Sequence, residues 1–349
     1  GPETLTGEQV GMLKGYRIAL VGASTPVGRE LVRLLEERGF PALEVVALEP
    51  GGSLESPGEY LGSGIPVRPL DEAAFTGMNL AFFASGPRAS VEFARGARRQ
   101  GTVVIDLTAA FRLEKDVPLV IPELDPQALS THDGIIACPS PGAVQMALVL
   151  APIHRKAGVK RVVASVYQAV SDAGEGAMDE LTGQLTGLLN FQETTCSVFP
   201  HRIAFNVIPQ AGIFLENGYT SDEMGMMLEM QRLLRSEDLR ISVTSARVPV
   251  FYSHAQSLSV ETDRKISPAE VRRLLASSPG VKVEDRPADG VYPLPMEATG
   301  KDECLAGRIR RDLSWDNGVA LWTSMDNVRK GAALNAVQIA EQVIAPRNG

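Results

Sequence analysis

The sequence predicts an α/β fold: a Rossmann-type, parallel, doubly wound sheet followed by a second, α+β domain. Three observations support this prediction. The apolar run Tyr16–Val21 leads into a glycine-containing turn and then an amphipathic helix that closes at Gly39, which is the Rossmann order. Strand and helix patterns then alternate as far as residue 139. Finally, 349 residues exceed what one hydrophobic core usually holds.

Each element of the first domain has a sequence pattern of its own. Residues Ser90–Arg99 are expected to form a helix after the third strand. The expected strands are apolar runs bounded by turn residues, namely Tyr16–Val21, Leu43–Leu48, Leu80–Ala84, Thr102–Leu107 and Leu119–Ile121. Strands separated by helices at this spacing pair in parallel.

The pattern changes after residue 139, where strands and helices are grouped rather than alternating. Expected strands are Arg161–Val170, Ile241–Tyr252, Ser257–Asp263 and Gly318–Ser324, the second and third being neighbours joined at a Ser253-His254 corner. Expected helices are Val144–Ala157, Glu175–Leu189, Ser221–Leu234, Pro268–Ala276 and Val328–Val343. The predicted organisation is a disordered lead or tag over 1–14, a Rossmann domain over 15–139 completed by 328–345, and an α+β domain over 140–327.

Composition excludes several classes of function. The net charge of −8 argues against nucleic acid and anionic membrane as partners. No apolar run is long enough to span a bilayer, and the first thirty residues contain no secretory leader pattern. The three cysteines include no CxxC pair, which indicates a reducing compartment and no structural metal. We therefore expect a cytoplasmic protein without a metal site.

The turn from Gly22 to Gly28 is the candidate cofactor-binding element. It follows a strand and opens a helix, so its amides would meet a pyrophosphate, although its spacing is not G-x-G-x-x-G. Glu49 ends the second strand, where a ribose-binding acid is expected. No Lys or Arg lies between Arg38 and Arg68, so the expected cofactor is NAD or NADP with NAD favoured. The alternative interpretation, a Rossmann scaffold that no longer binds a nucleotide, stays open. The candidate residues are Gly22, Ser24, Thr25, Val27, Gly28 and Glu49.

The stretch Gly134–Met146 reads as a strand, a tight turn and a helix start, which is where a nucleophile is often placed. Its cysteine, Cys138, still lies within the apolar strand. A core position is therefore the favoured interpretation for this thiol.

Arg247 and His254 are further candidates. An arginine inside the apolar segment Ala246–Val250 requires a carboxylate or phosphate partner. Only seven residues separate the two side chains, so we expect them near one end of a shared hairpin.

The chain resembles the aspartate-semialdehyde dehydrogenase family. The resemblance extends from Gly15 to about Ile344, and its motifs are long and ordered. They are Gly22-Ala23 with Val27-Gly28, Val104-Ile105-Asp106, Ala110-Phe111-Arg112, Asp116–Glu123, Tyr167–Ser171, Ala204-Phe205-Asn206, Arg247–Val250, His254, and Asp326-Asn327 with Gly331–Ala333.

The resemblance implies an activity in amino-acid biosynthesis: a cysteine adds to the aldehyde, hydride passes to NADP, and phosphate releases the acyl group. It also implies a homodimer formed through the open sheet face of the second domain. By position, His254 matches the acid/base, Gln168 and Arg247 the substrate-binding residues, and Arg112 a phosphate ligand. Asp222 stands in place of an amine-binding glutamate, and Ser171 and Asn327 belong to the cofactor side.

Several positions depart from the family pattern. Pro141 occupies the position of the nucleophilic cysteine, and proline has neither a thiol nor an N–H. Gly225 replaces a phosphate-binding lysine, Asp172 replaces a glycine, and Thr25 replaces the middle glycine of the nucleotide turn. These departures resemble the paralogue branch of the family that lacks the catalytic cysteine.

The departures lead to a hypothesis with two alternatives. We expect a homologue without phosphorylating dehydrogenase activity that keeps a pocket for a small carboxylate metabolite around Arg247 and His254. One alternative is an active NAD(P)-dependent oxidoreductase acting on aspartate semialdehyde or a related acid. The other is a metabolite-binding or regulatory partner.

Overall fold

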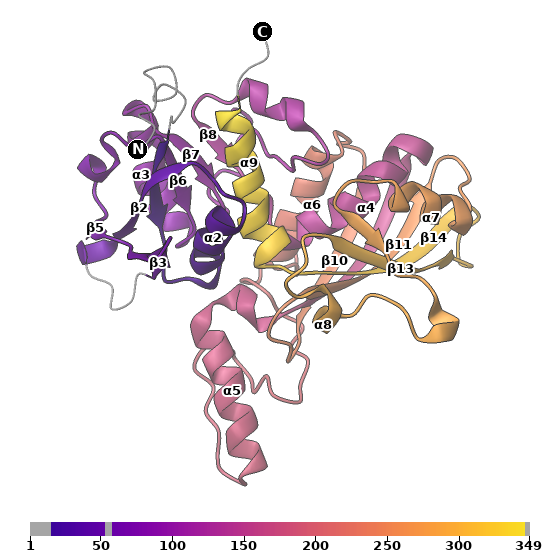
Figure 1. The fold of residues 1–349 in the computed structure, drawn as a ribbon. Helices are drawn as coiled ribbons and strands as arrows, with labels where there is room; N and C mark the ends of the chain where they lie inside the picture. Colours follow the sequence, from indigo (N-terminus) through magenta and orange to yellow (C-terminus); the bar gives the residue numbers. More distant parts are fainter. Residues whose placement is uncertain (1–14, 53–57, 346–349) are drawn as a thin grey trace, which may run out of the picture. The chain divides into compact units, whose positions relative to one another are not determined.

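The computed structural model describes residues 15–52 and 58–345. The lead or tag expected over 1–14 lies outside these residues. The described chain divides into two units (Figure 1). Residues 15–118, 129–137 and 336–345 form the first unit, and residues 119–128 and 138–335 form the second.

The first unit contains the predicted Rossmann-type sheet. All its strand pairs are parallel, and their spatial order β5-β2-β1-β6-β7-β8 is the order 3-2-1-4-5-6 of a dinucleotide-binding fold. The strands are β1 (Tyr16–Val21), β2 (Ala42–Glu49), β5 (Val67–Pro69), β6 (Leu80–Phe83), β7 (Val103–Asp106) and β8 (Ile135–Ala137). A small antiparallel pair consists of β3 (Glu59–Tyr60) and β4 (Ser63–Gly64).

The helices of the first unit are α2 (Pro26–Glu37), α3 (Pro87–Arg99) and most of α9 (Leu334–Ile344). Helix α2 begins at Pro26, inside the expected Gly22–Gly28 turn, because Thr25 caps it and Pro26 occupies its first turn. Its apolar stripe of Leu31, Leu34 and Leu35 is fully buried. Hydrophobic periodicity therefore places the helix against the core.

One predicted strand of this sheet is wrong. Residues 119–121 form no strand, and the sixth position in the sheet belongs to β8. The apolar run is flanked by Pro118 and Pro122, which have no N–H to continue a ladder. The run Ile135–Ala137 has no such interruption.

The second unit is built on a mixed six-stranded sheet in the order β10-β9-β11-β14-β13-β12. Helices α4, α6 and α7 pack on it around an apolar core, and α8 is a single short turn. The strands are β9 (Val159–Gln168), β10 (Arg240–Arg247), β11 (His254–Thr262), β12 (Val281–Val283), β13 (Cys304–Arg311) and β14 (Gly318–Met325). The helices are α4 (Pro141–Ala157), α5 (Glu175–Leu189), α6 (Ser221–Leu233), α7 (Pro268–Ala276) and α8 (Pro295–Ala298).

The expected hairpin between the strands around residues 245 and 258 is wrong. Strand β9 lies between β10, to which it is parallel, and β11, to which it is antiparallel. The chain leaving β10 crosses the end of β9, where Val250 and Phe251 carbonyls accept hydrogen bonds from Val170 N and Ser171 N. Arg247 and His254 thus flank β9 instead of sharing a hairpin.

Helix α5 extends from the sheet of the second unit (Figure 1). A small apolar core beneath it includes Ala177, Leu181 and Ile203. Buried Glu180 on this helix accepts hydrogen bonds from Ser197 N (2.7 Å), Val198 N (2.6 Å) and Phe199 N (3.3 Å). The carboxylate of Glu180 therefore binds the backbone of residues 197–199 to α5.

We expect Glu180→Gln to loosen this segment by about 1–2 kcal/mol, because charged acceptors make the stronger hydrogen bonds. Burial alone would raise the pKa of Glu180, but the amides of Val198 and Ser197 hold it below its ordinary value of 4.5. The carboxylate thus stabilises the fold above that pH, and the contribution is lost as the pH falls through the lower folded pKa. Hydrogen exchange of residues 197–199 measures the effect. Unchanged protection in the variant would contradict this role.

Candidate functional site

Three predicted site residues form a row across neighbouring strands of the second unit. Arg247 on β10 is the register partner of Gln168 on β9, and His254 begins β11 on the other side of β9. All three side chains are more than nine-tenths buried. The fold therefore brings together a cation, an amide and an imidazole at one end of the sheet.

The backbone of Ala169 orients two members of this row. Its N–H donates to His254 Nδ1 at 3.1 Å, and its carbonyl accepts from Arg247 Nη1 at 2.9 Å. Because Nδ1 accepts, the imidazole proton of a neutral His254 is on Nε2. The Nε2 edge is therefore the edge available for proton donation.

Asp172 completes the cluster from the 3₁₀ turn η4 (Val170–Ala173). Its Oδ2 lies 3.2 Å from Arg247 Nη1, and its Oδ1 lies 3.7 Å from His254 Nε2. Burial alone would raise the pKa of Asp172, but the nearby imidazole of His254 and the charge of Arg247 hold it well below its ordinary value. Asp172 is thus ionised and serves as the counterion of the buried arginine.

Two buried polar atoms of the row have no hydrogen-bond partner among the described residues. They are Arg247 Nε, a donor, and Gln168 Oε1, an acceptor. Buried polar groups are nearly always hydrogen bonded to protein or water. The cluster therefore keeps unused capacity for one acceptor and one donor from outside the chain.

The nucleophile turn lies at the start of α4. Ser140 caps the helix, with its Oγ 3.4 Å from Ala143 N, and Pro141 is the first helical residue. Ser140 N and Oγ both donate to Glu229 Oε2, at 2.7 and 2.9 Å. Gln256 Nε2 donates to the carbonyl of Gly142 at 2.8 Å, which joins the helix start to β11. The start of α4 is thus hydrogen-bonded to α6 and β11, and the position matched to the nucleophile carries a pyrrolidine ring.

Cys138 does not supply a nearby substitute. It is 1% exposed, as the apolar run around it predicted, and Cys304 is also buried. Burial raises the pKa of the Cys304 thiol far above its ordinary value. Cys196 is exposed, on the segment returning from α5. Neither buried cysteine offers an accessible thiolate.

In the first unit, the Gly22–Gly28 turn uses most of its own amides. Thr25 Oγ1 accepts from Gly28 N at 2.9 Å and donates to the Gly22 carbonyl at 2.8 Å, while Thr25 N donates to the same carbonyl at 3.2 Å. Pro26 has no N–H. Ser24 is exposed, and Val27 follows in the first turn of α2. Few donors of this helix start remain for a phosphate.

Glu49 points into this turn. Its Oε1 accepts from Ala23 N at 3.0 Å, and the amide of Ser24 also donates to the carboxylate. Burial raises the pKa of Glu49 in spite of these two amides. A carboxylate from the chain thus takes the amides that would face a pyrophosphate. A pyrophosphate at these two amides would have to displace Glu49 from them, and the ribose role of Glu49 stays a prediction.

The remaining predicted residues have hydrogen bonds or neighbours of their own. Arg112 of the first unit donates to the carbonyl of Leu107 at 2.8 Å. Asp222 lies in the first turn of α6, beside Gly212. Asn327 Nδ2 donates to Ser171 Oγ at 3.0 Å, so these two predicted cofactor residues bind each other.

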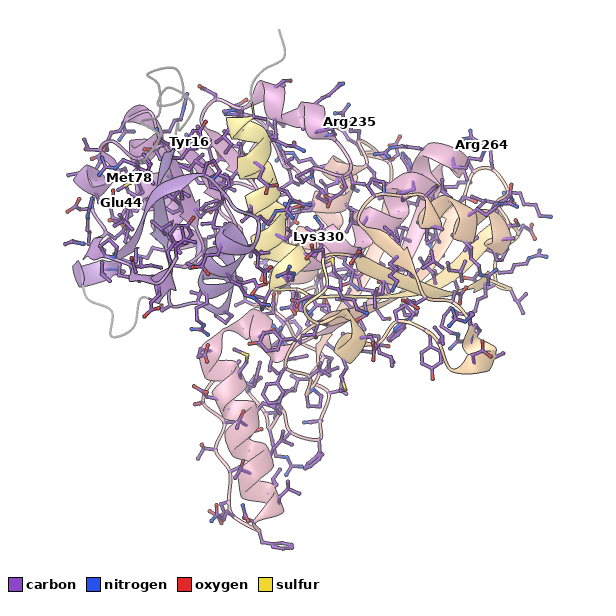
Figure 2. The ribbon with its side chains drawn as sticks, in the orientation of Figure 1. Tyr16, Glu44, Met78, Arg235, Arg264 and Lys330 are labelled. Carbon is purple, nitrogen blue, oxygen red and sulfur yellow. The ribbon has the colours of Figure 1, made fainter. Side chains whose placement is uncertain are left out.

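Two carboxylates that the sequence analysis missed are structurally central. Glu229 accepts a hydrogen bond from Ser140 N at the start of α4. The sequence feature that could have identified it is an acidic residue inside the otherwise apolar run Met226–Met230. Glu123 Oε1 lies 2.7 Å from Lys330 Nζ. Lys330, which is labelled in Figure 2, belongs to the π-helical turn η6 (Arg329–Ala333). Lys330 is fully buried, and burial lowers its pKa although Glu123 opposes this shift. The sequence feature that could have identified this ion pair is Lys330, a lysine within a stretch of small residues.

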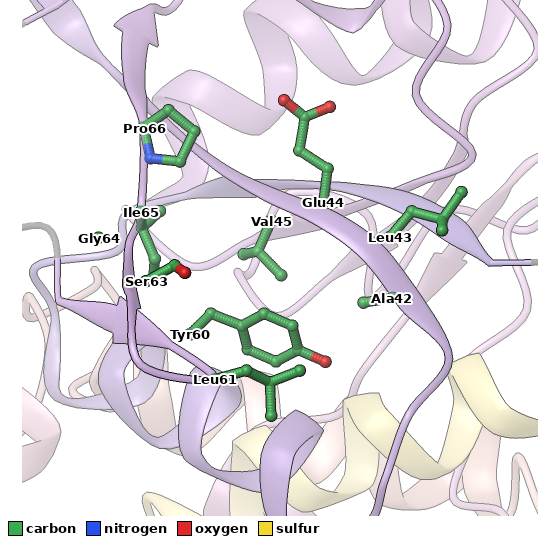
Figure 3. Close-up of a pocket in the computed structure, with 10 residues that line it drawn as sticks. All are labelled: Ala42, Leu43, Glu44, Val45, Tyr60, Leu61, Ser63, Gly64, Ile65 and Pro66. Atoms are coloured by element: carbon green, nitrogen blue, oxygen red, sulfur yellow. The ribbon is translucent and has the colours of Figure 1, made fainter. Parts of the chain in front are cut away.

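A separate cavity of about 280 Å³ lies in the first unit, beside the amino-terminal half of β2 (Figure 3). Figure 3 shows Tyr60 and Val45 on its walls, and the carboxylate of Glu44 turned away from it. Glu44 is ion-paired with Arg17 and Arg68 instead. The cavity contains none of the predicted site residues. Among the described residues there is no cluster of three or more potential metal ligands and no helix long and apolar enough to cross a membrane.

Two family models match the chain. Residues 17–132 match the model described as semialdehyde dehydrogenase, NAD binding domain, and residues 150–330 match semialdehyde dehydrogenase, dimerisation domain. An aspartate-semialdehyde dehydrogenase of Aquifex aeolicus is 44% identical over 95% of this chain and 98% of its own length. The Bacillus subtilis protein of that name is 38% identical over the same shares of the two chains.

Solved structures of aspartate-semialdehyde dehydrogenases also match this chain. The structure of aspartate semialdehyde dehydrogenase II from Vibrio cholerae matches with a TM-score of 0.92 and 37% identity, covering 96% of this chain and all of that one. A second structure of that Vibrio protein is described as complexed with ASA. A probable aspartate-semialdehyde dehydrogenase from Pseudomonas aeruginosa has a TM-score of 0.89 and 31% identity, covering 95% of this chain and 99% of that one.

Proposed function

Given that this chain belongs to the aspartate-semialdehyde dehydrogenase family, we propose that it does not carry out the phosphorylating, thiol-dependent oxidation of aspartate semialdehyde. One observation carries the proposal: Pro141 begins α4 where the family resemblance places the cysteine. A proline can neither attack the aldehyde carbon nor donate an N–H to the oxyanion that would form.

The rest of the pocket supports this proposal. Cys138 and Cys304 are buried, so neither can replace the missing thiolate. Asp172 engages both Arg247 and the proton-donating edge of His254. The residues that would hold the substrate and move its proton are therefore occupied by a side chain of the protein.

The experiment is a turnover assay with aspartate semialdehyde, phosphate and either NADP or NAD, following absorbance of the reduced nucleotide. We expect no rate above a blank without enzyme. The Cys138→Ser variant serves as the matched control and should be indistinguishable from the wild type. Turnover in the wild type that disappears in this variant would overturn the proposal.

A second candidate is an active NAD(P)-dependent oxidoreductase on aspartate semialdehyde or a related acid. The comparisons support it better than they support loss of activity, since relatives with that enzyme name are 38–44% identical over nearly the whole chain. Such chemistry would have to proceed without a thiol ester. Reduced nucleotide formed at equal rates with and without phosphate, and unaffected by Cys138→Ser, would identify this candidate.

We also propose a homodimer in solution. Residues 150–330 match a dimerisation domain, and the second unit exposes large apolar side chains, including Phe191, Phe205, Ile213 and Phe214. Such residues cluster at interfaces. Light scattering coupled to size exclusion measures the mass, and a particle of one chain would contradict the proposal. A binding or regulatory role for the pocket remains the third hypothesis.

A further inference from the structure

Asp172 is the most exposed member of an otherwise buried charge cluster. Its side chain is 23% exposed, whereas those of Arg247 and His254 are 6% and 1% exposed. The carboxylate contacts both of these side chains with separate oxygens. Of these three side chains, that of Asp172 is therefore the one mainly in contact with solvent.

The guanidinium of Arg247 already has its charge balanced. A buried arginine stays protonated and requires an anion, which Asp172 supplies at 3.2 Å. The same Nη1 atom also donates to the Ala169 carbonyl. A second carboxylate at this position would stand next to that of Asp172, and like charges in a poorly solvated site repel strongly.

The cluster nevertheless contains two buried polar atoms that the chain does not use. Arg247 Nε and Gln168 Oε1 are buried and have no partner among the described residues. The two side chains leave adjacent strands at the same register position, so both emerge on the same face of the sheet. This donor and acceptor are independent of Asp172 and indicate binding capacity that the chain itself does not use.

We propose that Asp172 is a specificity-determining residue, a built-in carboxylate that occupies the place of a ligand carboxylate at Arg247. The native pocket then rejects small amino-acid carboxylates and accepts them when Asp172 is removed. This inference rests on the proposed function in one respect, since the ligand class tested is that of the family substrate.

The test is calorimetric titration of L-aspartate into wild type, Asp172→Gly and Asp172→Asn, without nucleotide or phosphate. We expect Asp172→Gly to bind at least about tenfold more tightly than wild type, because the repelling charge and its atoms are both gone. Asp172→Asn removes only the charge and should fall between them. Glu175→Gln, an equal charge change at a nearby exposed site, should behave as wild type.

The double variant Asp172→Asn with Arg247→Gln should lose the gained affinity, which assigns it to the guanidinium. Equal affinity of wild type and Asp172→Gly would overturn the proposal, as would folded variants that do not bind. A variant that refolds only when L-aspartate is present supports it, and one that stays unfolded with L-aspartate contradicts it. Turnover by the wild type would overturn the proposed function without changing the order of these affinities.

Discussion

Replacing Glu123 by glutamine is expected to lower the free energy of unfolding by about 3–5 kcal/mol. Lys330 is fully buried, and its Nζ lies 2.7 Å from Glu123 Oε1. Without the carboxylate, the ammonium must either remain charged in an apolar environment or release its proton, and both cost stability. Denaturant unfolding of the two proteins measures the difference.

The control is the double variant Glu123→Gln with Lys330→Met, which removes both charges and keeps similar volumes. Its stability should recover most of the loss, because no unpaired charge is then left in the interior. If Glu123→Gln alone unfolds at the same denaturant concentration as wild type, the pair does not stabilise the second unit.

Exchanging Gly28 for alanine is expected to destabilise the first unit by about 2–3 kcal/mol. A Cβ at this position would lie 2.1 Å from the carbonyl oxygen of Gly22 and 2.9 Å from Ala23 Cα. Both neighbours are backbone atoms of the turn, so no side-chain rotation relieves the contact. Helix α2 would have to move away from the turn, and hydrogen exchange of β1 and α2 would report the loosening.

Gly183→Ala is the matched control, because Gly183 also lies inside a helix but has no atom within 4 Å of the added Cβ. It should be neutral or stabilise α5 by up to about 1 kcal/mol, the usual helix preference for alanine. A Gly28→Ala protein as stable as the wild type would show that α2 and the turn do not need this close approach.

The elements that were predicted well depend on local sequence. Helices α5 and α7 have the predicted bounds, because the residues that begin each helix lie next to it in the sequence. Gly174 precedes α5, and Ser267 and Glu270 form a capping box at the start of α7. Strand order depends on pairing between distant segments. The neighbours of β9 could not be read from the 248–253 connection, since a turn there fits a hairpin and a crossing equally well.

The candidate site was predictable in part. A buried arginine in an apolar strand requires an anion, which the sequence indicated for Arg247, but that anion is Asp172, 75 positions away. Spacing along the sequence cannot predict this ion pair, because only the tertiary fold brings η4 beside the end of β10. Gln168 could be predicted only from the family resemblance. Glu49 was predicted to bind a ribose, and its hydrogen bonds to the Gly22–Gly28 turn were not predicted.

The start of α4 has a consequence for the stability of this chain. Ser140 as the cap and Pro141 in the first turn are among the most favourable choices for beginning a helix. Proline at a compatible position adds about 0.4–1 kcal/mol by restricting the unfolded chain. Replacing Pro141 by cysteine would therefore sacrifice this contribution to stability, and Asp172 and Gly225 would still be in place.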